Sequence, residues 1–325
     1  MHSFDLLSIG NVTVDIFLSI PDASEHFSVT ANKELVLKIG DKIHLEKYDI
    51  SLGGDASNVA IGVGRLGFST TLAAETGYDE FLPKITKTLE KEGVDQSLLR
   101  RGQEKESCFS VIINYKGDRI IFAEERQREH KFDFTQIETK IVYLTSLGKQ
   151  WIDAYEKALL FAEQNSSRLI FNPGAHQIEE KNEIIGKVLK RCDLIFLNKE
   201  EAKTILGENP LEIRELAQKI KALGPKEVVI TNGVEGSYFL DNQGVLYKAG
   251  LVQTEVVERT GAGDAFASGF ISAILLGLPP EERLFWGSAN SASVIGQLGA
   301  IAGLLSKEEM EEKSKSKSSF RVEKL

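Results

Sequence analysis

Short apolar segments alternate with amphipathic helical patterns along most of the 325-residue chain, and this alternation constrains the fold more than any other feature. The segments expected to form strands are 5–10, 70–75, 141–146, 168–172, 193–198 and 227–232. Helices are expected between most of these strands, beginning near Ala56, Glu80, Trp151, Glu179 and Leu211. Strands that alternate with helices form parallel sheets with both faces covered. The pattern therefore predicts an α/β fold with a mostly parallel central sheet.

Two regions interrupt the alternation, at about residues 17–50 and 108–134. The first has the pattern of extended segments joined by polar turns, and the second that of a hairpin turning at KGD. Together they predict a small β-sheet inserted into the α/β body. A further hairpin is expected at 236–250, with its turn at DNQG.

The chain is expected to form one large domain, residues 1–305, followed by a charged tail, residues 306–325. The tail is rich in serine, lysine and glutamate, a composition typical of flexible, solvated segments. A helical turn or two is expected only at its KEEMEE sequence.

Charge and hydropathy argue against nucleic-acid and membrane partners. The formal net charge is −9 and no basic cluster is present. The longest apolar stretch, FISAILLGL, is far shorter than the roughly 20 residues that a helix needs to span a bilayer. The N-terminus lacks the pattern of a signal peptide, and the two cysteines, Cys108 and Cys192, provide no disulfide framework. These features predict a cytoplasmic protein.

A dinucleotide-binding fingerprint appears literally as GVGRLG, residues 62–67, but its context is wrong. The fingerprint requires a strand before the glycines and a helix after them. Here a helical pattern precedes and a strand pattern follows, so the glycines are expected to end a helix. The sequence also contains no P-loop motif.

The stretch ERTGAGDAFASGF, residues 258–270, places small residues and an aspartate directly before an apolar helix. Free N–H groups and the dipole at a helix N-terminus attract anions, and Gly261, Ala262 and Gly263 leave those groups accessible. Beside such an anion hole, Asp264 is suited to accept the proton of a hydroxyl that attacks phosphorus. The alternative is that Asp264 only caps the helix.

Polar residues recur where other predicted elements meet. GGDASN, residues 53–58, opens a helix, and Asp55 or Asn58 could bind hydroxyl groups unless Asp55 merely caps that helix. Asp15 is expected just beyond the carboxyl end of the first strand, where ligands bind in open α/β sheets.

The same edge of the sheet is expected to collect FNPG, NKEEA and TNGVEGS, each of which follows a predicted strand. Asn198 and Glu201 are suited to the hydration shell of Mg²⁺ and to phosphates, or they form a helix cap and a solvent-facing glutamate. Gly233 and Gly236 suit backbone contact with a nucleotide, or they shape a plain hairpin turn.

With these motifs in this order, the chain resembles the ribokinase-like (PfkB-type) carbohydrate kinases from GNVTVD to about residue 300. The segments GGDASNVAIGVGRLG and TGAGDAFASGF carry most of the resemblance. It implies a three-layer α/β/α sandwich with a mostly parallel central sheet and a small β-sheet lid. The two interrupting regions would form this lid.

The resemblance also implies roles for individual residues, with ATP and Mg²⁺ as cofactors. Asp264 matches the base, and Gly261, Ala262 and Gly263 match the anion hole for the transferred phosphoryl group. Positions that match sugar contacts are Asp15, Gly53, Gly54 and Asn58, with Asp55 between them. Asn198 and Glu201 match the element that organises Mg²⁺, Glu201 through water, and the positions that match the nucleotide site are Thr231, Gly233, Gly236 and Asn290.

The sequence departs from the family pattern in two places. Glu258 and Arg259 replace the usual Asp-Thr, which leaves a monovalent-cation requirement open, and Arg259 is placed near the ATP phosphates as a hypothesis. Asp55 replaces lysine, serine or alanine and favours a neutral polyol. The lid loop EERQREH carries Arg126, Arg128 and His130, which could instead bind an anionic substrate or form a solvated loop.

The sequence is therefore identified as that of an ATP-dependent kinase acting on a hydroxyl of a sugar or sugar-like molecule. A nucleoside kinase of the same fold is the nearest alternative, with Phe17, Phe109 and Phe122 available to stack a base. A non-catalytic sugar or nucleotide sensor is a second alternative, although a sensor would not need Asp264. An exposed lid edge also predicts a homodimer formed through the lid.

Overall fold

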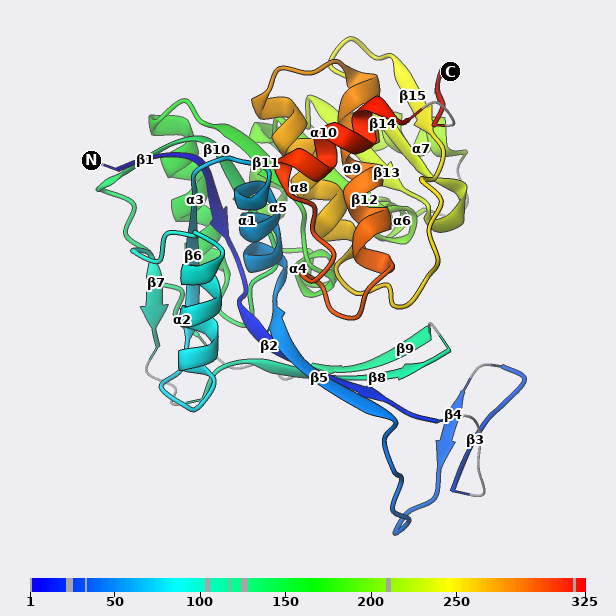
Figure 1. Cartoon of the computed structure of the whole chain (residues 1–325). Helices are drawn as coiled ribbons and strands as arrows, with labels where there is room; N and C mark the ends of the chain where they lie inside the picture. Colours follow the sequence, from blue (N-terminus) through cyan, green and yellow to red (C-terminus); the bar gives the residue numbers. More distant parts are fainter. Residues whose placement is uncertain are drawn as a thin grey trace.

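The apolar strand segments form the centre of a ten-stranded sheet in the computed structural model (Figure 1). The structure describes residues 2–21, 26–32, 34–102, 106–116, 118–123, 128–208, 212–317 and 320–325. In sheet order the strands are β16 (Val322–Lys324), β15 (Leu246–Ala249), β14 (Ser237–Leu240), β13 (Glu227–Thr231), β12 (Leu194–Asn198), β11 (Arg168–Phe171), β10 (Ile137–Leu144), β1 (His2–Ile9), β6 (Thr70–Thr76) and β7 (Leu99–Arg101).

The seven strands from β13 to β7 are parallel, and β14, β15 and β16 add antiparallel at one edge. The expected mostly parallel sheet is thereby confirmed. The strand β1 lies between β10 and β6. The chain therefore forms β6 and β7 on one side of β1 and then reverses to form β10 and the later strands on the other side. Such a reversal opens a crevice at the carboxyl ends of the strands.

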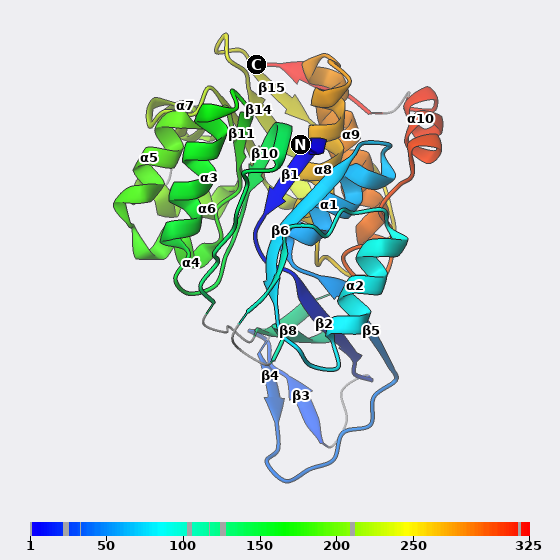
Figure 2. The ribbon, with the colours of Figure 1, turned by 90° about the vertical axis from the view of Figure 1, so that its left-hand side faces the viewer.

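Helices cover both faces of the sheet, which completes the expected three layers (Figure 2). One face carries α3 (Ile152–Gln164), α4 (Ala175–Glu180), α5 (Glu183–Arg191), α6 (Lys199–Leu206) and α7 (Ile213–Ala222). The other face carries α1 (Asp55–Arg65), α2 (Leu82–Lys91), α8 (Ala262–Leu275) and α9 (Pro280–Ile295), with α10 (Lys307–Lys315) outside α9.

The helix α8 lies in the second of these layers and is buried almost all round, as its apolar sequence predicts. Phe270 packs edge-on against Phe196 of β12 and Phe239 of β14, with ring centroids 5.5 and 5.2 Å away. This aromatic contact fixes α8 on the sheet and therefore fixes the position of its N-terminus.

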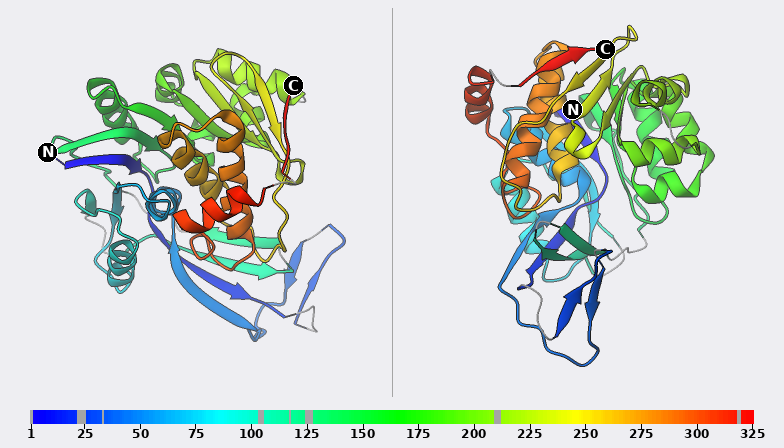
Figure 3. Two further views of the ribbon diagram at one scale, coloured as in Figure 1. Left: turned by 45° about the horizontal axis from the view of Figure 1, so that its top comes forward. Right: turned by 90° about the vertical axis from the view of Figure 1, so that its right-hand side faces the viewer.

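The interrupting regions form the predicted separate sheet, which projects from the body as a lid (Figure 3). Its four strands are β5 (Lys47–Gly53), β2 (Thr13–Ser19), β8 (Phe109–Tyr115) and β9 (Asp118–Ala123), and β3 (Phe27–Val29) pairs with β4 (Leu35–Leu37) beyond them. The pair β2–β8 is parallel and the other pairs are antiparallel. Gly117, in the predicted KGD turn, lies outside the described residues.

Two predicted helices differ in their boundaries. The helix expected near Glu179 is divided into α4 and α5, because Lys181 adopts a left-handed conformation (φ 49°) and the Asn182 side chain caps α5 by accepting from the Ile184 N–H. The helix expected at Leu211 begins at Ile213, and Leu211 itself lies outside the described residues. GVGRLG ends α1, as expected, with Gly67 at φ 96°.

The C-terminal segment is more ordered than the expected flexible tail. Residues Lys307–Lys315 form α10, which begins with a capping box between Ser306 and Glu309. Met310 is fully buried against α9, and β16 extends the central sheet. The charged composition concealed this order because the contacts depend on one methionine, on Phe320 and on backbone pairing. No helix among the described residues is long and apolar enough to cross a membrane.

We expect Met310→Ala to lower the free energy of unfolding by about 2 kcal/mol, because the substitution leaves a cavity beneath α10. Urea denaturation followed by circular dichroism measures the change. Glu311→Ala, an exposed neighbour on the same helix, is the matched control and should change stability by less than about 0.5 kcal/mol. Equal effects of the two substitutions would contradict a packed C-terminal segment.

Candidate active site

The start of α8 forms a wall between two cavities. Gly261 caps the helix with φ 76°, and a side chain there would lie 2.6 Å from the Cβ of Ala300. Thr260, Gly261 and Asp264 line one cavity, whereas Arg259, Ala262 and Gly263 line the other. A single turn of backbone therefore faces both compartments.

Two N–H groups of this turn have no intramolecular hydrogen bond among the described residues, those of Gly263 and Asp264. The N–H of Ala262 donates to the carbonyl oxygen of Arg259 at 3.3 Å, and the N–H of Ala265 closes the first helical turn onto Gly261. The available N–H groups and the dipole of α8 make the wall suited to a negatively charged group.

The first cavity, here called the lid cavity, has a volume of about 350 Å³ and lies between the lid and the carboxyl ends of the central strands. Asn11 and Val12 line it directly after β1, and Ser146 lines it after β10. The inner face of the lid contributes Asp15, Ser110, Ile112, Ile121 and Ala123. Of the predicted sugar-contact residues, Asp15, Gly54, Asp55 and Asn58 line this cavity.

Asp264 is held at the bottom of the lid cavity by a hydrogen bond from Asn58 Nδ2 to its Oδ2, at 2.8 Å. Burial raises the pKa of Asp264 well above its usual value, and the nearby carboxyls of Asp55, Asp15 and Glu201 raise it further. The Asn58 bond opposes that shift. A buried carboxyl with a raised pKa is suited to accept a proton.

Asp15 and Asp55 add two further buried carboxyls. Burial raises the pKa of Asp15 to about 6, partly offset by hydrogen bonds from Thr13 and Ser110. Burial also raises the pKa of Asp55, and its Oδ2 accepts a hydrogen bond from Ser146 Oγ. Gly53 does not line the cavity; it leaves room for Asp15, whose Oδ2 would lie 2.0 Å from a Cβ at position 53. These carboxyls suit ligand hydroxyl groups.

A basic group forms another part of the lid cavity. Arg128 is only 3% exposed, and its Nη2 donates to the carbonyl oxygen of Glu106 at 2.5 Å. Its Nε and Nη1 are buried and have no hydrogen-bond partner among the residues that the structure describes. Glu75, whose Oε2 accepts the His130 N–H, contributes a nearby negative charge. Arg126, predicted with them, lies outside the described residues.

His130 lines the cavity beside Arg128 and is neutral near pH 7, because burial, and then the Arg128 charge, lower its pKa to about 4. Its Nδ1 lies 4.0 Å from Glu75 Oε2, and with a neutral ring this contact is not an ion pair. The backbone at Gly148 and Lys149 lies close enough to oppose this lowering of the pKa. Both residues line the cavity, and Arg128 brings a buried positive charge to this part of its wall.

The second cavity, here called the helix cavity, has a volume of about 720 Å³ between the β13–β14 turn and helices α8 and α9. Thr231, Gly233 and Gly236 line it, as the sequence predicts. Much of its remaining wall is apolar and was not predicted, namely Val234, Leu251, Val252, Val256, Phe266, Ala292 and Ile295. An apolar cleft with a few polar groups and an anion-binding wall fits a nucleotide.

Asn290 was predicted to belong to the nucleotide site, but it does not line the helix cavity. It is fully buried, and its Nδ2 donates to Ala265 O and Ser268 Oγ at 3.0 and 2.9 Å. Its Oδ1 accepts the Leu305 N–H at 2.9 Å. Asn290 therefore joins α9 to α8, while Ser288, Ser291 and Ala292 of the same helix line the cavity.

Asn198 and Glu201 lie where β12 passes into α6, and they form a reciprocal capping box with hydrogen bonds of 2.8 and 2.9 Å. The predicted helix cap is therefore present, but Glu201 is half-buried and belongs to the cap rather than facing solvent, and its second oxygen has no role in the cap. Burial and Asp55 raise the Glu201 pKa. No group of three or more His, Cys, Asp or Glu residues among those described could hold a metal directly. The site fits an Mg²⁺ that retains waters and phosphate oxygens as ligands.

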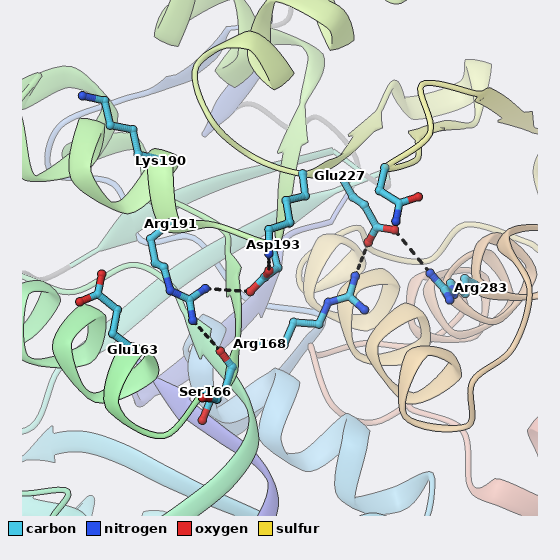
Figure 4. A pocket seen from close by; sticks show the side chains of 11 residues that line it. Glu163, Ser166, Arg168, Lys190, Arg191, Asp193, Glu227 and Arg283 are labelled. Carbon is cyan, nitrogen blue, oxygen red and sulfur yellow. Dashed lines mark hydrogen bonds and ion pairs between the residues drawn. The ribbon is translucent and has the colours of Figure 1, made fainter.

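A third cavity, of about 730 Å³, opens at the opposite edge of the sheet, where β11, β12 and β13 begin (Figure 4). Most of its charged side chains pair with one another: Arg168 and Arg283 flank Glu227, and Arg191 Nη1 lies 3.1 Å from Asp193 Oδ2. Because these charges are already paired, we assign this cavity to the ionic network that joins the strand starts.

The sequence predicted the glycine-rich turns and aspartates of the site but missed Glu75, Ser146, His176 and Gln177, all of which line the lid cavity. Ser146 directly follows β10 and could have been found by the position rule that indicated Asp15. Glu75 lies within β6, a strand whose residues are all buried, and a charged residue in such a strand was its only signal.

Comparison with known proteins agrees with this geometry. A family model described as pfkB family carbohydrate kinase matches residues 28–307. The chain belongs to this family. A 5-dehydro-2-deoxygluconokinase of Clostridium botulinum is 26% identical over 317 residues, covering 90% of this chain and 88% of the relative.

Solved structures show the same fold. Arabidopsis thaliana ribokinase complexed with ribose and ATP has a TM-score of 0.75 at 19% identity, covering 96% of this chain and 98% of that one. An Escherichia coli protein provisionally described as a ribokinase II, solved with ATP and Mg²⁺, has a TM-score of 0.78 at 18% identity, covering 96% and 99%. The chain is therefore a carbohydrate kinase of ribokinase-like fold.

Proposed function

We propose that this carbohydrate kinase transfers the γ-phosphoryl group of ATP to a hydroxyl of a sugar or sugar derivative bound in the lid cavity. The observation that supports this most directly is the wall at residues 259–264, which faces the helix cavity on one side and Asp264 and the lid cavity on the other. ATP in the helix cavity would place its terminal phosphate at the wall, opposite the acceptor hydroxyl.

In the proposed reaction, the acceptor oxygen forms a bond to the γ-phosphorus while the bond from that phosphorus to the β,γ-bridging oxygen breaks, and ADP leaves. Asp264 accepts the hydroxyl proton, for which its raised pKa is suited. The N–H groups of Gly263 and Asp264 stabilise the charge on the transferred group. Mg²⁺, held through water by Glu201, would neutralise phosphate charge.

The lining of the lid cavity favours a sugar over a nucleoside. None of its described lining residues is phenylalanine, tyrosine or tryptophan. Phe17 is buried in the lid, Phe109 packs on Phe81 with ring centroids 6.1 Å apart, and Phe122 is exposed. The predicted stacking residues therefore serve other contacts. The non-catalytic sensor is disfavoured by the Asn58–Asp264 pair, since binding alone needs no buried base.

Asp264→Asn should lower kcat about 10²- to 10⁴-fold, because the amide cannot accept the proton. In the unsubstituted protein, kcat/KM for the acceptor should rise with pH through a range above that of an ordinary carboxyl, since the base is active only when deprotonated. An assay of ADP release with ATP, Mg²⁺ and a panel of sugars, sugar acids and nucleosides measures the change in kcat and the pH dependence of kcat/KM. Unchanged turnover in Asp264→Asn would contradict the assignment of the base.

We further propose that the acceptor is a sugar acid. The Clostridium relative is named for an acid of this kind. Arg128 lines the lid cavity, and its Nε and Nη1 are buried without a hydrogen-bond partner among the described residues, so its positive charge favours a carboxylate in this cavity. The three aspartates of the same cavity suit hydroxyl groups, so Asp55 and Arg128 would bind different groups of one molecule.

Arg128→Gln should raise KM for a sugar acid about 10- to 100-fold, because the neutral side chain loses a charge-assisted hydrogen bond. Each aldonic or ketoaldonic acid in the assay is compared with the sugar alcohol that carries CH₂OH in place of its carboxylate. Arg101→Gln, an exposed arginine of β7, is the control. A wild-type protein that prefers the sugar alcohols would contradict a sugar-acid acceptor.

We also propose a homodimer formed through the lid. The strand β9 is an edge strand, all six of its residues are exposed, and Phe122 is 58% exposed. Sedimentation equilibrium should give a dimer for the unsubstituted chain and a monomer for Phe122→Glu. Tyr78→Glu, at an exposed body residue, should remain dimeric. A monomer at all working concentrations of the unsubstituted chain would contradict this proposal.

A further inference from the structure

Glu258 is a buried carboxylate that shapes the wall between the two cavities. Its side chain is 1% exposed. Its Oε1 accepts hydrogen bonds from the Thr260 N–H at 2.8 Å and from Thr260 Oγ1 at 2.6 Å. Because Thr260 directly precedes the cap residue Gly261, these two bonds fix the backbone that leads into α8.

The charge of Glu258 is only partly compensated within the body. Its Oε2 is buried and has no hydrogen-bond partner within the described part of the chain. The nearest ion pair recorded among the described residues comes from the lid, where Arg119 Nε lies 3.6 Å from Oε1. A buried charge is strongly unfavourable unless a counter-charge accompanies it. The lid therefore supplies the positive charge that pairs with Glu258.

Arg119 belongs to the same face of β9 as the residues that cover the lid cavity. It precedes Ile121 and Ala123 by two and four positions, and alternate residues of a strand share a face. A movement that brings Ile121 over a bound acceptor therefore also brings the guanidinium toward Glu258. In the structure Ile121 lines the lid cavity while Arg119 lies beside Glu258.

We infer that Arg119 is a positioning residue that couples lid closure to the geometry of the phosphoryl-transfer wall. With the lid in place, the guanidinium neutralises Glu258, and Glu258 holds Thr260 and Gly261 so that the free N–H groups face the transferred phosphate. With the lid away, Glu258 is buried without its counter-charge and the turn is less firmly held. The inference rests on the proposed kinase reaction and explains how ATP hydrolysis without an acceptor would be limited.

The test compares Arg119→Ala and Arg119→Lys with Lys47→Ala, which removes an exposed lid cation on β5. Arg119→Ala should lower kcat at least 10-fold, with KM for ATP changed less than about twofold, and lower the phosphorylated product formed per ADP released. Arg119→Lys should restore part of the loss, and so should added guanidinium ion with Arg119→Ala. Lys47→Ala should behave as the unsubstituted chain. A kcat within twofold for Arg119→Ala would overturn the inference.

A double-mutant cycle tests whether the two residues act as a pair. Glu258→Gln removes the charge but keeps an oxygen that can accept from Thr260. If the pair acts as a unit, the double variant should be no more impaired than Arg119→Ala alone, whereas multiplied effects would overturn the coupling.

Hydrogen–deuterium exchange separates failure of this inference from failure of the proposed reaction, because it needs no acceptor. Arg119→Ala should increase exchange of the amides at 258–264 at least threefold, while Lys47→Ala should not. Unchanged exchange would overturn the coupling even if the protein proves to be a sugar kinase. Absence of turnover on every acceptor, with the exchange result as expected, would instead reject the proposed reaction.

Discussion

The organisation of this protein depends on a helix whose first turn lies between two cavities and is not internally satisfied. The helix α8 packs against the sheet through Phe270, and its N-terminus leaves the N–H groups of Gly263 and Asp264 without partners among the described residues. Free N–H groups at a helix N-terminus pair with water or with a ligand, and the helix dipole favours an anion there. The two cavities that meet there, and the residues that shape them, are arranged around this constraint.

The lid cavity has an acidic region and a basic region, which suit different groups of a ligand. Asp15, Asp55 and Asp264 bring three carboxyls together, and burial raises the pKa of each. Arg128 and His130 line another part of the same cavity, and Arg128 carries a positive charge there. An acidic and a basic region in one cavity explain why Asp55 alone and the basic loop alone gave opposite indications of the substrate.

Much of the fold could be predicted from the sequence because its signals are local. Apolar strand segments, the DNQG turn and the ends of α1 all depend on residues close together in the chain. Residues whose roles depend on distant partners were less predictable. Asn290 has the position of a ligand-contacting residue, but its amide is taken by Ala265, Ser268 and Leu305. The order of the C-terminal segment likewise depends on the pocket that receives Met310.

The sequence by itself determined the layered α/β architecture, the lid insertion and the glycine-rich helix start with its aspartate, because strand patterning and helix capping act within a few residues. Only the tertiary structure decided that residues 259–264 separate two cavities, that Asn58 contacts Asp264 across 206 positions of sequence, and that Arg119 of the lid meets Glu258 of the body. The physical reason is that burial and electrostatic pairing depend on which surfaces are brought together, and sequence spacing carries no record of those distances.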